Sequence, residues 1–332
     1  MKQKKKSTRD SIIEMLQSEK DYVSGQEMCD RLELSRTAVW KHIKALKAEG
    51  YIIDSVNNKG YKLVSSPDIL TVELIKDNIN TNWLADNIIY LPETDSSNIQ
   101  AKLLGESGGS NGTVIVTDRQ TAGRGRRGRE WISPSGNIYF SMLLYPDVRV
   151  ERAPMITLIA AMAVAKAVRE SEKLETMIKW PNDVVANGKK ICGILTESST
   201  DLEYIQYVVV GIGINSNQKE FDVEIRKMAT SISLENGRDV KRAKLLAKFF
   251  DCFEEYYDTF LKTEDMSNLS ETYNELLINK GRDVKIIEKD RERVLKAIGI
   301  NNMGGLIVEN SNGEKETIIS GEVSVRGLYG YV

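Results

Sequence analysis

The sequence is most informative at Asp118-Arg-Gln-Thr-Ala-Gly-Arg-Gly-Arg-Arg-Gly-Arg-Glu-Trp131, where arginines alternate with glycines. The alternating residues are Gly123, Arg124, Gly125, Arg126, Arg127, Gly128 and Arg129. Ordering these glycines costs conformational entropy, and the neighbouring arginines repel one another. A bound anion would offset both costs. Glycines let backbone N–H groups approach a phosphate, and guanidinium groups bind it. The pattern therefore favours a phosphate-binding loop, although a flexible basic loop or a nucleic-acid contact has the same composition.

A second polar element, Lys179-Trp-Pro-Asn-Asp183, follows the apolar pair Met177-Ile178. Pro181 ends strand pairing, and Asn182-Asp183 favours a turn, so Lys179 is predicted to stand at the end of a strand. A lysine there is usually solvated. Beside the arginine loop, however, it is also a candidate to deliver a fixed positive charge to a binding site.

Apolar runs and helical patterns alternate around these two elements. Strand-like runs cover residues 88–91, 113–117, 138–144, 177–179, 194–195 and 208–214, and helical patterns cover 96–104, 154–170 and 240–261. This mixture predicts an α+β protein whose central domain is an α/β layer around one large mixed sheet. Residues 155–165 are nearly all apolar but fall far short of the roughly 20 that span a bilayer, so they indicate a buried helix and no membrane segment.

The first 62 residues predict a winged helix-turn-helix. Ser24-Gly-Gln-Glu27 is a capping box that opens the second helix, and a third helix begins near Ser35. A turn-rich segment, Asn57-Asn-Lys-Gly60, joins two short strand-like runs and would form the wing. This region carries a net charge of +4, against −6 for the rest of the chain.

In the third helix Val39, Ile43 and Leu46 recur at i, i+4 and i+7, which predicts that they face inward. The polar residues of the opposite face and the wing are candidates to contact DNA: Ser35, Arg36, Thr37, Lys41, Lys44 and Lys59. Basic side chains on an isolated helix are usually only a solvated face, but two preceding helices and a following hairpin favour DNA binding. Trp40 is not assigned, because it would equally well pack on another domain.

Composition removes several classes of chemistry. The single histidine, His42, lies in the basic N-terminal region, so the rest of the chain cannot use Ser-His-Asp, Cys-His or His-zinc mechanisms. The three cysteines are scattered, which suits neither a disulfide framework nor a Cys-x-x-Cys metal site and favours the reducing cytoplasm. No metal-ligating residues are predicted.

The arginine loop and Lys179-Trp-Pro-Asn-Asp183 together resemble the signature elements of bacterial biotin protein ligases that carry an N-terminal winged helix-turn-helix. Ser96-Ser-Asn98 looks like that family's Ser-Thr-Asn element, with Ser97 replacing threonine. Lys189-Lys-Ile-Cys-Gly-Ile-Leu-Thr-Glu197 is similar to its Gly-Ile-Leu-x-Glu strand, with Cys192 where a small residue is usual. Val210-Gly-Ile-Gly-Ile-Asn215 and Gly321-Glu-Val-Ser-Val-Arg326 resemble two further segments.

The resemblance implies three domains: a winged helix-turn-helix over residues 1–65, a catalytic domain over 66–279 and an SH3-like β barrel over 280–332. Ser65-Ser-Pro-Asp68 would be the linker. Short strand patterns from 283 to 319, with Gly304-Gly305 and Asn312-Gly313 between them, independently support a compact β domain at the end.

The resemblance also implies two half-reactions, in which the biotin carboxylate attacks the α-phosphate of ATP and a carrier-protein lysine then attacks the resulting biotinyl-AMP. A carboxylate is already a nucleophile at neutral pH, so the first step requires alignment and charge stabilisation more than a base. Mg²⁺ is expected with ATP. The implied partners are the biotin carrier protein, operator DNA and a second copy of the chain when biotinyl-AMP is bound.

Site residues follow from the matched motifs. Lys179 and Arg126 are the predicted catalytic residues. Biotin would be bound by Ser96, Ser97, Asn98, Gln120, Gly123, Arg124 and Lys179. The nucleotide would be bound by Arg126, Arg127, Arg129, Trp131 and Asn215.

Two other functions stay open at this point. A lipoate-type ligase would use related chemistry on a similar fold, but the arginine loop and Lys179-Trp-Pro-Asn-Asp183 match the biotin branch. A repressor that only senses a small molecule would not require both the loop and Lys179.

Overall fold

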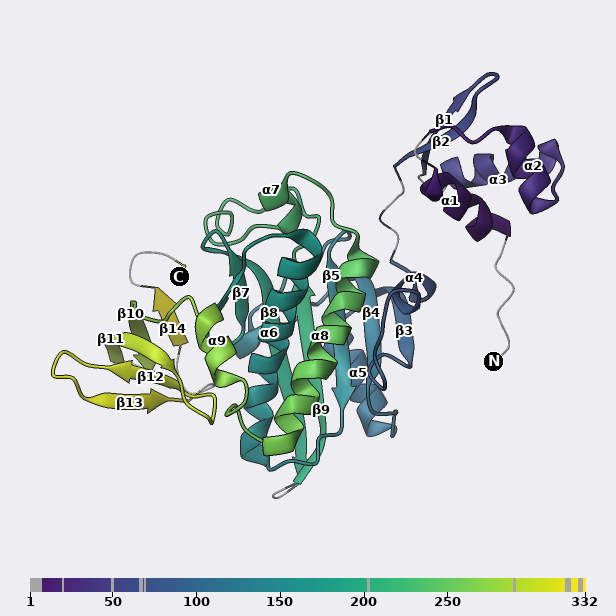
Figure 1. The fold of residues 1–332 in the computed structure, drawn as a ribbon. Coiled ribbons are helices and arrows are strands. Elements are labelled where there is room, and N and C mark those ends of the chain that lie inside the picture. The colour runs from purple at the N-terminus through teal and green to yellow at the C-terminus, as the bar shows by residue number, and fades with distance from the viewer. Residues whose placement is uncertain are drawn as a thin grey trace. The chain divides into compact units, whose positions relative to one another are not determined.

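The computed structural model describes residues 8–19, 21–48, 51–65, 68, 70–201, 204–288, 291–319, 324–327 and 331–332. The chain divides into two compact units, residues 1–69 and 70–332 (Figure 1). The boundary falls just after the predicted linker, residues 65–68, of which residues 66 and 67 lie outside the described residues.

The first unit is built from three helices and a β-hairpin, as the sequence predicts. Its elements are α1 (Thr8–Ser18), α2 (Gly25–Leu32), α3 (Arg36–Ala48), β1 (Ile52–Val56) and β2 (Gly60–Ser65). The Ser24 hydroxyl accepts the backbone N–H of Glu27 at 3.0 Å, which confirms the predicted start of α2. Val39, Ile43 and Leu46 are buried in the unit's core, so the predicted inward face of α3 is confirmed.

The second unit is centred on a seven-stranded mixed sheet in the order β3-β4-β5-β9-β8-β7-β6. Its strands are β3 (Ile88–Thr94), β4 (Thr113–Gln120), β5 (Ile138–Leu144), β6 (Met177–Lys179), β7 (Asp183–Ala186), β8 (Lys189–Asp201) and β9 (Tyr204–Ile214). Only β3 and β4 pair in parallel. This arrangement confirms the predicted large mixed sheet.

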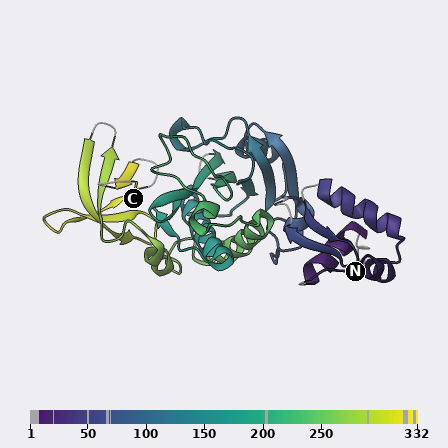
Figure 2. The ribbon, with the colours of Figure 1, turned by 90° about the horizontal axis from the view of Figure 1, so that it is seen from above.

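Helices cover both faces of this sheet. They are α4 (Val72–Lys76), α5 (Ser97–Glu106), α6 (Ala153–Glu172), α7 (Ile232–Asn236), α8 (Arg242–Thr263) and α9 (Ser270–Leu276). The long helices α6 and α8 lie side by side against one face (Figures 1 and 2). Successive strand residues point to opposite faces, so Val114 and Val116 join the core beneath these helices while Ile115 packs with Ala101 of α5. Residues 155–165 are all buried within α6, as predicted.

The chain's last described strands form an antiparallel sheet in the order β13-β12-β11-β10-β14. They are β10 (Asp283–Glu288), β11 (Arg291–Ile300), β12 (Leu306–Glu309), β13 (Lys315–Ile318) and β14 (Ser324–Gly327). The backbone of the described residues pairs neither end strand with the other, so the predicted closed SH3-like barrel is not confirmed. Residues 321–323 of its predicted last strand lie outside the described residues. The Trp180 indole N–H donates to Gly304 O at 3.0 Å and ties this sheet to the large one.

All three cysteines, Cys29, Cys192 and Cys252, are buried and carry free thiols. None of the helices in the described ranges is both long and apolar enough to cross a membrane.

Candidate active site

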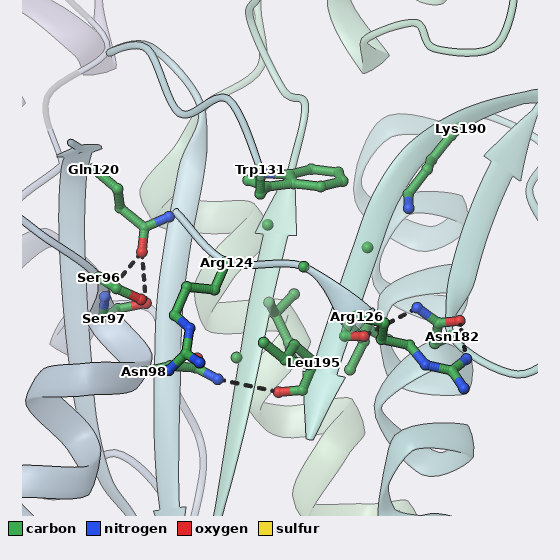
Figure 3. Close-up of a pocket in the computed structure, with 16 residues that line it drawn as sticks. Ser96, Ser97, Asn98, Gln120, Arg124, Arg126, Trp131, Asn182, Lys190 and Leu195 are labelled. Carbon is green, nitrogen blue, oxygen red and sulfur yellow. Dashed lines mark hydrogen bonds between the residues drawn. The ribbon is translucent and has the colours of Figure 1, made fainter. Parts of the chain in front are cut away.

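A pocket opens where the arginine loop, between β4 and β5, crosses strands β8 and β9 (Figure 3). It is lined by Ser96, Ser97, Asn98, Gln120, Arg124, Gly125, Arg126, Trp131, Asn182, Lys190, Gly193, Ile194, Leu195, Gly211, Ile212 and Gly213. Seven of these residues are among the predicted site residues, and the fold brings them together with residues of β8 and β9. The free space is only about 50 Å³.

One end of the pocket is a buried polar network at the start of α5. The backbone N–H and hydroxyl of Ser97 donate to Gln120 Oε1 at 2.9 and 3.1 Å. Asn98 Nδ2 donates to Glu197 Oε2 at 2.8 Å, and Asn98 Oδ1 lies 2.6 Å from the hydroxyl of Ser141 on β5. Buried amide and hydroxyl groups of fixed orientation are suited to recognising the polar edge of a small organic ligand.

Two glycines of β9 form the floor beneath this network. A Cβ atom at Gly211 would lie 1.7 Å from Asn98 Oδ1, and one at Gly213 would lie 2.5 Å from Trp131 Nε1. Both distances are shorter than van der Waals contacts. The side chains of Asn98 and Trp131 can therefore occupy their positions only because residues 211 and 213 are glycines, which have no Cβ. The Trp131 indole N–H is buried without a hydrogen-bond partner among the described residues.

The opposite end of the pocket is cationic. Arg126 Nη1 donates to Asn182 Oδ1 at 2.8 Å there, whereas Arg124 Nη1, 3.7 Å from Glu197 Oε1, lies at the end that holds Asn98 (Figure 3). Burial lowers the pKa of the Arg126 guanidinium, the charge of Asp183 opposes this, and Arg127 and Arg129 lower the pKa further. An anionic ligand would relieve this concentration of positive charge.

Glu197 balances the charges of Lys102 and Arg124 at the polar end of the pocket. Its carboxylate lies 2.5 Å from Lys102 Nζ in addition to its contacts with Asn98 and Arg124. Burial raises the pKa of Glu197, but hydrogen bonds from Asn98 and Lys102 and the charges of Lys102 and Arg124 outweigh burial and bring the pKa below its ordinary value.

The two lysines near the pocket occupy different environments. Lys179 at the end of β6 is only 6% exposed, is not among the lining residues, and its Nζ lies 3.4 Å from the ring centroid of Tyr331. Lys190 on β8 lines the pocket, with its Nζ 2.6 Å from Asp183 Oδ1 and 4.9 Å from the ring centroid of Trp131 (Figure 3). Lys190 lies in the segment Lys189–Glu197 that resembles the family strand, but it is not among the predicted site residues.

The remaining predicted site residues lie outside the lining. Gly123 is buried, and its carbonyl accepts the backbone N–H of Trp131 at 2.9 Å, which closes the arginine loop. Arg127 and Arg129 are exposed. Asn215 is buried at the end of β9, where its amide donates to Thr230 O at 3.1 Å.

The predicted DNA-binding residues form an exposed surface on the first unit. Ser35 Oγ accepts the backbone N–H of Ala38 at 3.2 Å and thereby caps α3. The other five, all exposed, are Arg36, Thr37, Lys41, Lys44 and Lys59. Lys44 Nζ lies 5.2 Å from the ring centroid of Trp40, which is also exposed. The surface is therefore available to a polyanion.

Models of three known domains match successive parts of the chain. The HTH domain matches residues 8–62, the biotin/lipoate A/B protein ligase family matches 90–215, and the biotin protein ligase C terminal domain matches 281–326. The first of these matches lies within the first unit, and the second contains every residue that lines the pocket. The chain is thus a ligase-type enzyme fold joined to a helix-turn-helix.

Whole-chain comparisons narrow this class. The bifunctional ligase/repressor BirA of Bacillus subtilis is 36% identical over 93% of this chain and 96% of its own length. The protein of the same name from Escherichia coli is 28% identical over 92% of this chain and 94% of its own length. The chain belongs to the biotin/lipoate A/B protein ligase family, among its bifunctional ligase/repressor members.

A solved structure supports the same assignment. The biotin protein ligase from Aquifex aeolicus, in complex with biotin and ATP, is 34% identical and superposes with a TM-score of 0.65. The match covers 73% of this chain and 99% of that one.

Proposed function

We propose that this chain joins biotin to a lysine of a biotin carrier protein at the expense of ATP, through biotinyl-AMP. The observation that carries the proposal is the two-ended pocket, with a buried amide and hydroxyl network beside Arg124 at one end and Arg126 and Lys190 at the other. Biotin has a polar ureido ring at one end and a carboxylate at the other, so the pocket offers partners of the right kind to each. The Aquifex aeolicus relative, a biotin protein ligase solved in complex with biotin and ATP, supports the same substrates.

In the first half-reaction a biotin carboxylate oxygen attacks the α-phosphorus of ATP. The bond between α-phosphorus and the bridging oxygen breaks, and pyrophosphate leaves. Negative charge builds on the phosphate oxygens, so a fixed cation at the pocket lowers the barrier more than a base would. Lys190 lines the pocket and Lys179 does not. We therefore assign to Lys190, with Arg126 beside it, the catalytic role predicted for Lys179.

In the second half-reaction the carrier lysine attacks the biotinyl carbonyl and AMP leaves. This intermediate must be shielded from water. The free space of about 50 Å³ holds little more than one or two water molecules, so the arginine loop and Trp131 must move to admit biotin and ATP. We assign Gly123 to the closure of this loop.

Nucleotide binding by Arg126, Arg127, Arg129, Trp131 and Asn215 remains a proposal. The described residues hold no group of three His, Cys, Asp or Glu side chains suited to a metal ion. We expect Mg²⁺ to accompany ATP as the counter-ion of its phosphates.

We further propose that the chain represses transcription of biotin genes, with α3 and the hairpin bound to operator DNA. Biotinyl-AMP would favour a homodimer by ordering the arginine loop, and the carrier protein would compete for the same surface. We also propose that the chain has three domains, over residues 1–65, 66–279 and 280–332, and that the last of them closes into an SH3-like barrel.

The test is biotin-dependent exchange of pyrophosphate into ATP by the full chain and by the variants Lys190→Met and Lys179→Met. We expect Lys190→Met to lose roughly 100-fold or more in rate, the scale of one preorganised electrostatic group, and Lys179→Met to lose less. Exchange that depends on lipoate would favour a lipoate ligase. Biotin binding without any exchange would favour a sensor.

A further inference from the structure

Tyr331 contacts two residues of the Lys179–Asp183 segment, next to the lining residue Asn182. Its hydroxyl donates to Asp183 Oδ2, and its ring lies against the Lys179 ammonium with 3.4 Å between Nζ and the ring centroid. Burial raises the pKa of Tyr331 well above its ordinary value, and the charge and hydrogen bond of Asp183 raise it further. The phenol therefore keeps its proton at neutral pH and acts as a hydrogen-bond donor.

Asp183 joins this tyrosine to the pocket. Its other carboxylate oxygen, Oδ1, lies 2.6 Å from Lys190 Nζ, and the two side chains are only 15% and 22% exposed. A carboxylate held at one oxygen alone can turn about its last side-chain bond, because that torsion is broad. With the Tyr331 hydroxyl at Oδ2, the plane of the carboxylate is fixed and Oδ1 faces Lys190.

Lys190 in turn has little freedom. Its Nζ lies between the Asp183 carboxylate and the face of the Trp131 indole, 4.9 Å from the ring centroid. A long lysine side chain loses rotamer freedom when it is held at one position. The Asp183 carboxylate imposes that loss before a substrate arrives, whereas Trp131 moves with the arginine loop. The orientation of Asp183 therefore determines where the lysine charge stands.

We propose that Tyr331 is a positioning residue for adenylation: its hydroxyl fixes Asp183, and Asp183 fixes Lys190 at the reacting phosphate. This proposal rests on the proposed ligase function. It gives the end of the β10–β14 domain a share in the active site of the large sheet. Tyr331 itself touches neither substrate.

The first test is Tyr331→Phe, which removes the hydroxyl and keeps the ring over Lys179. We expect kcat for biotin-dependent ATP/pyrophosphate exchange to fall roughly tenfold, the scale of one hydrogen bond to a charged group, while KM for biotin stays within about twofold. The matched control is Tyr273→Phe, since Tyr273 is fully buried and its hydroxyl has no partner among the described residues. We expect that variant to exchange within about twofold of the wild type.

The second test is a double-mutant cycle with Asp183→Asn. If Tyr331 acts through Asp183, Tyr331→Phe should add less than about twofold in the Asp183→Asn background. Calorimetric binding of biotinyl-AMP gives the same cycle without turnover, so the test holds even if Asp183→Asn is inactive. Losses that multiply, or a Tyr331→Phe enzyme equal to wild type, would overturn the positioning role. Absence of exchange in the wild-type chain would instead overturn the ligase function.

Discussion

A methyl group at Gly211 would collide with the side chain of Asn98. The added Cβ of Gly211→Ala would lie 1.7 Å from Asn98 Oδ1, so one of the two must move by more than 1 Å to reach an ordinary contact. Asn98 is held by Glu197, by Leu195 O at 3.3 Å and by the hydroxyl of Ser141. It cannot move that far and keep these hydrogen bonds.

Two effects set the size of the loss. Overpacking of a filled site costs roughly 1–3 kcal/mol, and a buried polar group left without its partner costs roughly another 1–3 kcal/mol. For a unit of this size each kcal/mol lowers the melting temperature by about 2–4 °C. We therefore expect Gly211→Ala to lose roughly 3 kcal/mol and to melt about 6–12 °C below the wild type.

Three further variants isolate the collision: Asn98→Ala, the double variant Asn98→Ala with Gly211→Ala, and Gly213→Ala. Asn98→Ala removes the obstructing amide, so Gly211→Ala should cost much less in that background than alone. Gly213→Ala displaces only the Trp131 indole, which stands on a loop and whose N–H has no partner to lose among the described residues, so its melting temperature should fall by less than about 3 °C. Differential scanning calorimetry of the four variants is the assay. A Gly211→Ala protein that melts within 2 °C of wild type, or an equal loss with and without Asn98, would refute this reasoning.

Three other predictions concern the charges. Arg126→Ala should speed release of biotinyl-AMP more than it weakens binding of biotin alone, measured by stopped-flow and calorimetry, whereas equal effects would argue against a phosphate clamp. Replacing Lys41 and Lys44 with Ala should reduce the salt dependence of DNA binding by about two phosphate contacts, and an unchanged slope would remove α3 from the DNA. Because the pKa of Glu197 lies below 4.5, its stabilising contribution is present above that pH and is lost as the pH falls through the folded-state value. Glu197→Gln should therefore lose less stability than wild type between about pH 5 and pH 3, and parallel melting curves would contradict this.

Local patterns were sufficient to predict most of the fold. The inward residues of α3 and the apolar run inside α6 follow from periodicity, because burial of one face is imposed along a single element. The arginine loop and Ser96-Ser-Asn98 were recognisable for a similar reason, since each is a continuous segment. The resemblance predicts that the last sheet closes into a barrel, which the described residues do not confirm; local patterns cannot decide closure, because it depends on pairing between strands that are far apart in the sequence.

The choice between the two lysines illustrates the same limit. Strand β8 pairs with β7 through an irregularity between Val184 and Val185, so that Val185 pairs with Lys190 while Val184 pairs with Cys192. A shift of one residue in this register would turn the opposite side chains of β8 toward the pocket. The face on which Lys190 stands is therefore set by a bulge that no local pattern indicates. The contact between Tyr331 and Asp183, which are 148 positions apart in the sequence, is even harder to predict from local patterns.

The burial of all three cysteines makes this chain a suitable background for thiol labelling. Burial raises the pKa of the Cys252 thiol to about 11 and that of Cys192 still further, and the thiolate is the form that reacts. A cysteine introduced at Ser135, which is exposed on the segment between β4 and β5, would react ahead of the native thiols. A fluorophore placed there would report each movement of the loop over Trp131 in an otherwise unaltered protein.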